Sequence, residues 1–344
     1  WFQLGSDSMW AEDGTPYGPV FIWFEALSVG AAGQSVEWAI FNLRLFAVMG
    51  LMLALIFTPL LARQHGIDPG RAQWLATANP LVLISYVASG HNDVIMVGLA
   101  LGAVYFAIRR NGVLAVILLT LSVGIKPITI VLLPFIGMMW AGNGSSWAKK
   151  FLYWCYSGGI FLAIMTVIGM LNGYGFGWVK VMLGTGTGYT FWSPVGFIQM
   201  LLGNLGNAFS FDHDFLASVV KLAGRLSSVV LVLILIFKGK DSQLTIRMTM
   251  AFTALVILSP VIHPWYLLWL LPFFAAIGIR DGWQLGWVVF TVAFLIGFGA
   301  YDQLHIWDFL GLGIIPNILS IAVTILMSLW LFVFNHRTRA FLDL

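Results

Sequence analysis

Long apolar runs, which follow one another along most of the chain, constrain the fold more than any other feature. Residues 38–62 carry a single charged side chain, Arg44. A helix of about 20 apolar residues crosses the hydrocarbon core of a bilayer. Charged residues make up only 9% of the sequence, whereas soluble domains carry about 25%. The sequence therefore predicts an all-α, polytopic integral membrane protein.

The spacing of the apolar runs predicts a helical bundle with about 10–11 membrane segments in one domain covering residues 1–344. The expected segments are 37–62, 72–88, 93–108, 113–124, 127–141, 151–171, 215–237, 245–262, 265–279, 283–300 and 309–334. The pair 113–124 and 127–141 is too short for two full spans. It predicts a short bent hairpin with Lys126 and Pro127 at its tip, because proline interrupts helical hydrogen bonding.

Two polar stretches are predicted to lie outside the membrane segments. Residues 1–35 form an expected outer loop with an interfacial or re-entrant helix at 19–31, for which Pro19 fits the first position. Residues 172–213, rich in Gly, Trp and Phe, are expected to be an ordered outer loop with a short helix. The chain opens on Trp1 without an initiator Met, so we expect the natural protein to extend further at the N-terminus. A single cysteine, Cys155, excludes an internal disulfide and a CxxC metal site.

The charges of the loops predict the orientation. One set of loops holds 12 of the 17 basic residues: Arg63, Arg71, Arg109, Arg110, Lys149, Lys150, Lys238, Lys240, Arg247, Arg280, Arg337 and Arg339. The positive-inside rule makes these loops cytoplasmic. Alternate threading then places the other loops outside: 1–35, 89–92, the Lys126 tip, 172–213, 263–264 and 301–308. Ten of the 14 acidic residues lie on that outer side or in helix ends that face it, and four of the six histidines lie on the outer side.

The stretch "SGHNDVIM", residues 89–96, sets His91, Asn92 and Asp93 side by side at the expected outer end of a helix. A carboxylate at hydrocarbon depth costs about 2.5–3.5 kcal/mol unless it has a partner. Helix capping is one explanation, because Asn and Asp are favoured N-caps and an acid at a helix N-terminus gains from the helix dipole. Capping does not account for the histidine, so a functional cluster is the other explanation.

Two basic residues lie between apolar flanks. Lys126 is either a snorkelling residue at the membrane interface or a clamp for a phosphate. Arg44 stands near the expected outer end of its span, where a guanidinium could bind a phosphate diester through two hydrogen bonds. The alternative for Arg44 is an ion pair with Glu37 or Glu25.

Aromatic and turn-rich stretches supply the remaining candidates. "SPVIHPWYLLWLLP", residues 259–272, places His263, Trp265 and Tyr266 at an outer boundary. They form either an aromatic belt or a platform on which sugar rings stack while His263 donates or accepts hydrogen bonds. "EDGTPYGPVFIWF", residues 12–24, is a stiff, turned loop that contains Asp13 and Tyr17. Its alternative role is only a turn and a helix cap.

Four motifs occur in one order: "TPYGPVF", "GIDPGRAQWLATANPLVLISYVASGHNDVIMVGLAL", a "KP" tip and "HPWYLLW". Together, over roughly residues 10–275, they resemble the polyprenol-phosphate-mannose-dependent α-1,6-mannosyltransferases of the GT-C superfamily. Members of that family often carry Glu where Asp93 stands. Their Asp-Pro-Tyr type motif in the first outer loop would fall upstream of Trp1. That Asp is the usual catalytic candidate, so the identity of the general base stays open for this chain.

The resemblance implies a mechanism. The donor would be polyprenyl-phosphate-mannose in the outer leaflet, and the acceptor a lipid-linked mannan or lipoglycan. Inverting transfer needs a carboxylate for the acceptor proton and cations or dipoles for the departing phosphate. The catalytic candidates are Asp93, His91 and Asp13. The expected substrate-binding residues are Tyr17, Asn92, Lys126, His263, Trp265 and Tyr266, to which charge placement adds Arg44.

These expectations place a multi-pass protein in a bacterial cell membrane, with its active site facing outside and membrane lipids as partners. No nucleic-acid partner and no metal ligands are assigned, and a requirement for a divalent cation is left open. A nucleotide-sugar donor is disfavoured, because the sequence lacks a Gly-rich βαβ fingerprint. The alternatives are another GT-C transferase (glucosyl or arabinosyl), a secondary transporter, or a scaffold without chemistry. Mannose rests on the resemblance alone.

Overall fold

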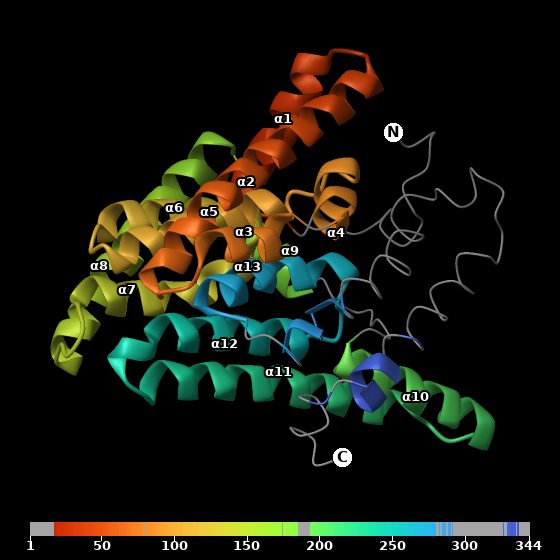
Figure 1. The fold of residues 1–344 in the computed structure, drawn as a ribbon. Helices are drawn as coiled ribbons and strands as arrows, with labels where there is room; N and C mark the ends of the chain where they lie inside the picture. The colour runs from red at the N-terminus through yellow and green to blue at the C-terminus, as the bar shows by residue number, and fades with distance from the viewer. Residues whose placement is uncertain are drawn as a thin grey trace. The chain divides into compact units, whose positions relative to one another are not determined.

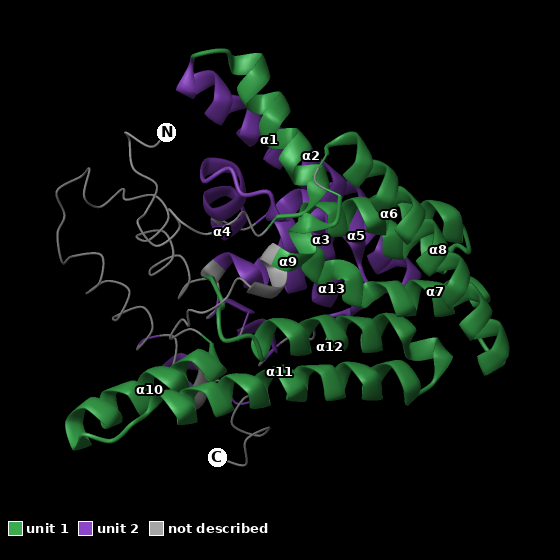
Figure 2. Cartoon of the chain, turned by 180° about the vertical axis from the view of Figure 1, so that it is seen from behind, with its two compact units in different colours: residues 1–34, 102–263 green, residues 35–101, 264–344 purple. Residues whose placement is uncertain are grey.

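The computed structural model describes residues 17–78, 80–173, 175–184 and 193–279, together with short pieces between 282 and 336. Every regular element in these ranges is a helix, which confirms the all-α class. The chain divides into two compact units (Figure 2). Unit 1 comprises residues 1–34 and 102–263, and unit 2 comprises residues 35–101 and 264–344.

In unit 2, helix α2 (Val36–Gln64) packs against α3 (Pro69–Thr77) and α13 (Leu267–Ile277). The shorter elements of this unit are α4 (Pro80–Val82), a π-helix (Leu83–Ala88), the first part of α5 (Asp93–Ile108), a 3-10 turn (Pro264–Tyr266) and a second π-helix (Trp330–Phe334). The Ser35 hydroxyl caps α2 by accepting from the Trp38 N–H. Small residues then let α2 and α5 touch, because a Cβ at Gly98 would lie 2.7 Å from the Gly50 carbonyl oxygen.

In unit 1, α6 (Gly112–Ile125) packs against α1 (Pro19–Ala32), α7 (Leu133–Ala141) and α8 (Trp147–Leu171). Helices α11 (Asp214–Phe237) and α12 (Leu244–Ile257) run side by side (Figure 1), and α10 (Pro194–Phe209) packs against α11. The other elements are α9 (Gly177–Gly184) and two 3-10 turns (Pro127–Leu132 and Asp241–Gln243). Side chains of Asn111, Ser146 and Ser193 cap α6, α8 and α10 by accepting from backbone N–H groups.

The predicted hairpin is confirmed. Helix α6 ends at Ile125, Lys126 is extended (φ −143°, ψ 118°), and Pro127 opens the 3-10 turn. The arm formed by this turn and α7 packs back on α6. Pro127 ends the helix because it lacks an N–H and its ring excludes the preceding helical geometry. The predicted helix at 19–31 is also present as α1, with Pro19 in its first turn.

Three described helices are long and apolar enough, by length and composition, to cross a membrane: α2, α8 and α11. They agree with the predicted segments 37–62, 151–171 and 215–237. The predicted span 72–88 is instead divided around Pro80 into α3 and the α4–π segment. The stretch 172–213 holds two helices, α9 and α10, where one short helix was expected. The predicted segments 283–300 and 309–334 lie largely outside the described residues, so the count of 10–11 crossings stays a prediction.

Contacts inside each unit join loops that the charge pattern places on the same side of the membrane. In unit 1, the Gly144 N–H donates to Asp241 at 2.9 Å, which joins two expected cytoplasmic loops. The Gly18 N–H donates to the Ile125 carbonyl at 3.0 Å, which joins two expected outer ones. In unit 2, Arg71 donates to the Ile279 carbonyl at 2.8 Å between expected cytoplasmic ends.

Asp241 holds the loop ends of unit 1 together. Its carboxylate accepts from Lys150 Nζ at 2.7 Å, with the two side chains 9% and 15% exposed. Nearby, Arg247 donates to the Leu235 and Ile236 carbonyls at 2.7 and 2.6 Å. These carbonyls belong to the last turn of α11 and have no partner within the helix, so Arg247 completes their hydrogen bonding.

Replacing Asp241 with Asn should lower the free energy of unfolding and should also make that free energy depend less on pH. Burial raises the pKa of Asp241. Hydrogen bonds from Lys150 and the Gly144 N–H and the charges of Lys150 and Arg247 lower the pKa. Together they outweigh the effect of burial, so the pKa of Asp241 lies below its ordinary value. The stabilisation is therefore present above the unfolded-state pKa of about 3.9 and is lost as the pH falls through the folded-state value.

Loss of an exposed ion pair costs at most about 1 kcal/mol, and removal of one partner from a fully buried pair costs about 3–5 kcal/mol. We expect the cost of Asp241→Asn to lie between these two values. Tryptophan fluorescence of the purified protein, followed through thermal unfolding from pH 7 to pH 3, measures both effects. The parent should lose stability in acid more steeply than the variant. Parallel curves would contradict the assignment.

Candidate functional site

The turn that leads into α5 sets out the first group of candidate residues. The Ser89 hydroxyl donates to the Ile84 carbonyl at 3.0 Å and closes the π-helix. Gly90 then reverses the chain with φ +67°, a conformation that favours glycine. The Asn92 carbonyl accepts from the N–H groups of Ile95 and Met96 at 3.1 and 3.4 Å, so α5 starts directly after it. This geometry places Asp93 in the first turn of the helix.

Asn92 and Asp93 are almost completely buried, with 4% and 1% of their surface exposed. The Asp93 carboxylate lies 3.9 Å from His91 Nδ1. The positive end of the α5 dipole and the neighbouring imidazole therefore help to offset the cost of burying this acid. The Asn92 side chain does not cap α5. Among the described residues, neither polar atom of the Asn92 side chain has a hydrogen-bond partner.

His91 is held by an aromatic neighbour from the other segment of unit 2. Its ring stacks on Trp265, with centroids 4.3 Å apart and planes at 23°. Trp265 is itself buried and meets Tyr266 edge-on. Tyr266 in turn stacks on Trp269 at 3.8 Å. Trp265 therefore packs against the His91 ring, and Tyr266 and Trp269 continue the aromatic cluster beyond it.

Arg44 reaches the same turn from α2. Its Nε donates to the Ala88 carbonyl at 3.0 Å, just before the reversal at Gly90. A Cβ added at Gly90 would lie 3.8 Å from Arg44 Cγ, so the arginine stem runs along the turn. Glu37, one of its two expected ion-pair partners, accepts from the Ser35 hydroxyl at 2.9 Å. Arg44 thus joins Asp93, Asn92 and His91 in unit 2.

Tyr86 is a further candidate that the sequence did not predict. It lies in the π-helix, is 3% exposed, and its hydroxyl has no hydrogen-bond partner among the described residues. The π-helix ends at Ala88, so Tyr86 belongs to the segment that leads into the turn before Asp93. Single turns of π-helix often occur at functional sites. The sequence feature that could have indicated Tyr86 is a hydroxyl group seven residues before Asp93, in an apolar segment that Pro80 interrupts.

Three buried polar atoms in the residues that precede Asp93 thus lack partners in the described structure: Tyr86 Oη, Asn92 Nδ2 and Asn92 Oδ1. Buried polar groups in proteins are almost always hydrogen-bonded, and each exception costs about 1–3 kcal/mol. A ligand rich in hydroxyl groups, which both donate and accept, would satisfy all three. With a carboxylate beside them, these groups can bind such a ligand and accept a proton from it.

The second group of candidates lies in unit 1. Lys126 Nζ stands 5.8 Å from the centre of the Tyr17 ring, within the range of a cation–π contact. The backbone holds this pair in place, because a Cβ at Gly18 would collide with the backbone of Gly124 at the end of α6. The ammonium group also lies at the C-terminal end of that helix, where the dipole favours a cation. Both side chains are half-buried.

The remaining candidates are less defined. His263 is half-buried in the extended segment before Pro264. Asp13 lies outside the described residues. In the part of the chain that the structure describes, no group of three His, Cys, Asp or Glu side chains could hold a metal ion. The structure thus brings together His91, Asn92 and Asp93 with Arg44 and Trp265 in unit 2, and Tyr17 with Lys126 in unit 1.

Comparison with known proteins identifies the family. A family model described as "Alpha-(1->6)-mannopyranosyltransferase, N-terminal domain" matches residues 1–142, and the "MptB C-terminal domain" matches residues 193–331. A probable alpha-(1->6)-mannopyranosyltransferase of Mycolicibacterium smegmatis is 30% identical over 85% of this chain and 58% of its own length.

Two proteins of Mycobacterium tuberculosis are similar as well. One alpha-(1->6)-mannopyranosyltransferase is 28% identical over 85% of this chain and 59% of its own length. Alpha-(1->6)-mannopyranosyltransferase A is 27% identical over 87% of this chain and 61% of its own length. The chain therefore spans about three fifths of the length of these relatives. With both domain models matched, the chain belongs to the MptA/MptB family of alpha-(1->6)-mannopyranosyltransferases.

Proposed function

We propose that the protein is a membrane mannosyltransferase. It transfers a mannosyl residue from polyprenyl-phosphate-mannose to a lipid-linked mannan or lipoglycan acceptor at the outer face of a bacterial membrane. The observation that carries this proposal is the buried Asp93 carboxylate in a segment whose neighbours Asn92 and Tyr86 carry buried polar atoms without partners among the described residues. The names of the relatives, alpha-(1->6)-mannopyranosyltransferases, support mannose as the sugar and an α-1,6 linkage.

Asp93 is assigned as the general base of the transfer. The acceptor hydroxyl oxygen attacks the anomeric carbon of the donor sugar, and the bond from that carbon to the phosphate oxygen breaks. The acceptor proton moves to the Asp93 carboxylate, and polyprenyl phosphate leaves with the bonding electron pair. His91, 3.9 Å from Asp93 and stacked on Trp265, orients the carboxylate. Asp13 is the rival base.

Asn92 and Tyr86 are assigned to the sugar hydroxyls. Each carries buried hydrogen-bonding atoms without a partner, so binding sugar would satisfy groups that are costly in the empty site. Arg44 stabilises the turn that presents them, through its hydrogen bond to the Ala88 carbonyl. Tyr266 and His263 remain proposed contacts for the sugar or the lipid phosphate.

Lys126 is assigned to the donor phosphate. An ammonium group is a compact point charge suited to neutralising a phosphate, and the Tyr17 ring holds it from one side. Three long apolar helices and the family support the membrane setting. The outer-face orientation rests on the distribution of basic residues between the loops.

Asp93→Asn should reduce sugar transfer about 10²–10⁴-fold, the usual contribution of a general base. The amide has the same shape but cannot accept the proton. His91→Ala should reduce transfer strongly too. The assay is transfer from radiolabelled polyprenyl-phosphate-mannose in membranes, with protein level checked by immunoblot. Asp214→Asn, which changes an almost fully exposed acid, is the control. Full activity of Asp93→Asn would show that Asp93 is not the general base, and Asp13 would be the next candidate.

Tyr86→Phe separates a functional role from a structural one. The substitution removes a hydroxyl that has no partner in the described structure, so thermal stability should stay the same or rise. Transfer should nevertheless fall about tenfold, because one hydrogen bond to the sugar is lost. Tyr105→Phe, a half-buried tyrosine on α5, is the control. A loss of stability together with activity would show that the hydroxyl is structural.

Lys126→Met should raise the donor concentration needed for half-maximal transfer, so that the defect is largest at low donor. The variant keeps an apolar stem that can still contact Tyr17 but removes the charge that meets phosphate. Lys126→Arg should restore part of the donor affinity. Lys180→Met, at an exposed position of α9 that is expected on the same side, serves as the control. An unchanged dependence on donor would exclude Lys126 from donor binding.

A further inference from the structure

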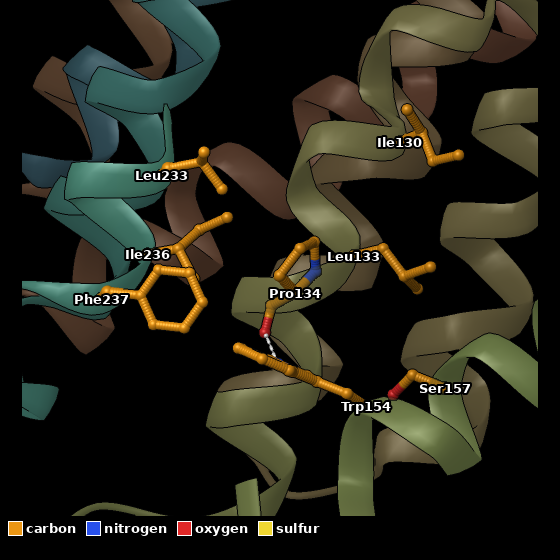
Figure 3. Close-up of a pocket in the computed structure, with 8 residues that line it drawn as sticks. All are labelled: Ile130, Leu133, Pro134, Trp154, Ser157, Leu233, Ile236 and Phe237. Atoms are coloured by element: carbon orange, nitrogen blue, oxygen red, sulfur yellow. Dashed lines mark hydrogen bonds between the residues drawn. The ribbon is translucent and has the colours of Figure 1, made fainter. Parts of the chain in front are cut away.

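An apolar groove of about 400 Å³ lies in unit 1 (Figure 3). Ile130, Leu133 and Pro134 form one wall, Leu233 and Phe237 of α11 form the other, and Trp154 of α8 closes it. The Trp154 indole N–H donates to the Pro134 carbonyl at 2.8 Å, so this polar group is already satisfied. A groove of this volume is large enough for a ligand, and its lining suits a hydrocarbon chain.

The groove lies among helices that are expected to meet lipid. Helices α8 and α11 are two of the three described helices that are long and apolar enough to cross a membrane. Ile130, Leu233 and Phe237 are exposed on its rim. Water has few hydrogen-bond partners in such a site. A chain from the surrounding bilayer is therefore the occupant that the lining favours.

One end of the groove carries aromatic rings and lysines. Trp147, the exposed first residue of α8, lies 5.5 Å from Phe237 and 6.2 Å from Trp154 between ring centres. Lys150 Nζ stands 4.8 Å from the centre of the Trp147 ring. Lys238 follows Phe237 directly and is exposed. Tryptophan and lysine gather where hydrocarbon meets head groups, so this end lies at head-group level.

The charge at this end is positive. Lys238 and Lys240 are exposed in the loop that follows α11, and Lys149 is exposed in the first turn of α8, where its ammonium stands 5.9 Å from the centre of the Tyr153 ring. The one acid in loops 142–150 and 238–243, Asp241, is engaged by Lys150 and by the Gly144 N–H. The positive-inside rule accounts for lysines in these loops but not for their place at the mouth of an apolar groove. Basic groups beside membrane helices bind anionic lipid head groups.

We propose that this groove and the lysine beside it bind one anionic glycerophospholipid, with an acyl chain between α7, α8 and α11 and the phosphate at Lys238. Lys126 lies at the opposite end of the arm that runs from Pro127 to Ala141. Lys238 and Lys126 are therefore expected in different leaflets, which separates this site from the proposed donor site. The proposal does not depend on the proposed function.

Native mass spectrometry of the purified protein tests this site, with phosphatidylglycerol and phosphatidylcholine of identical chains as probes. The parent should retain one phosphatidylglycerol more tightly than phosphatidylcholine. Leu233→Trp fills the groove with a ring and should abolish this retention. Leu231→Trp, at an exposed position on the opposite face of α11, is the matched control and should keep it. Thermal unfolding of both variants verifies that they fold.

Lys238→Gln should weaken phosphatidylglycerol binding about fivefold, the usual effect of one basic residue near a membrane surface. Arg63→Gln, an exposed base at the end of α2, should not. Equal retention of the two phospholipids, or retention by Leu233→Trp, would overturn the proposal. Displacement of phosphatidylglycerol by a lower concentration of polyprenyl phosphate would also overturn it, by assigning the groove to that lipid.

Discussion

A carboxylate buried at the start of α5 is the constraint that orders the surrounding structure. An acid that is 1% exposed in a strongly apolar chain requires compensation, and Asp93 obtains it from the helix N-terminus and from His91. The preceding turn makes this arrangement possible. A π-helix that contains Tyr86 ends at Ala88, and Gly90 follows it with a positive φ. Arg44 and Trp265 then fix the two sides of that turn.

Unit 1 solves the opposite electrostatic problem, a cation between apolar flanks. Lys126 stands at the C-terminal end of α6, where the helix dipole favours its charge, and beside the Tyr17 ring. Close backbone contact between Gly18 and Gly124 holds the two segments together. Tyr17 and Gly18, which directly precede α1, and the hairpin tip are therefore parts of one structure, although more than 100 residues separate them in the sequence.

Hydropathy and proline positions predicted much of the fold. The spans at 37–62, 151–171 and 215–237 form single helices because their apolar runs contain no strong breaker apart from Pro59. Hydropathy predicts one helix at 72–88, but the structure divides this segment around Pro80. A hydropathy average does not detect the proline break or the π-helix. The two helices within 172–213 were underestimated, since glycine-rich composition masked the Pro194–Phe209 segment.

The candidate site was predicted in part for a similar reason. His91, Asn92 and Asp93 were visible because polar residues stand out in an apolar sequence. Tyr86 was not, because one hydroxyl barely changes hydropathy, and its burial and lack of a partner are three-dimensional properties. The stacking of His91 on Trp265 joins residues 174 positions apart, and periodicity carries no information about such a pair.

Unmet hydrogen-bonding atoms have a consequence for selectivity. If Asn92 and Tyr86 are satisfied only by a sugar, a deoxy analogue that lacks the matching oxygen would leave a buried polar atom stranded in the complex. Sites of this kind discriminate against the missing group more sharply than apolar pockets discriminate between sizes. Recognition would then depend on the hydrogen bonds that these side chains lack without a ligand, and the stereochemistry of the sugar would be recognised through the positions of its oxygens.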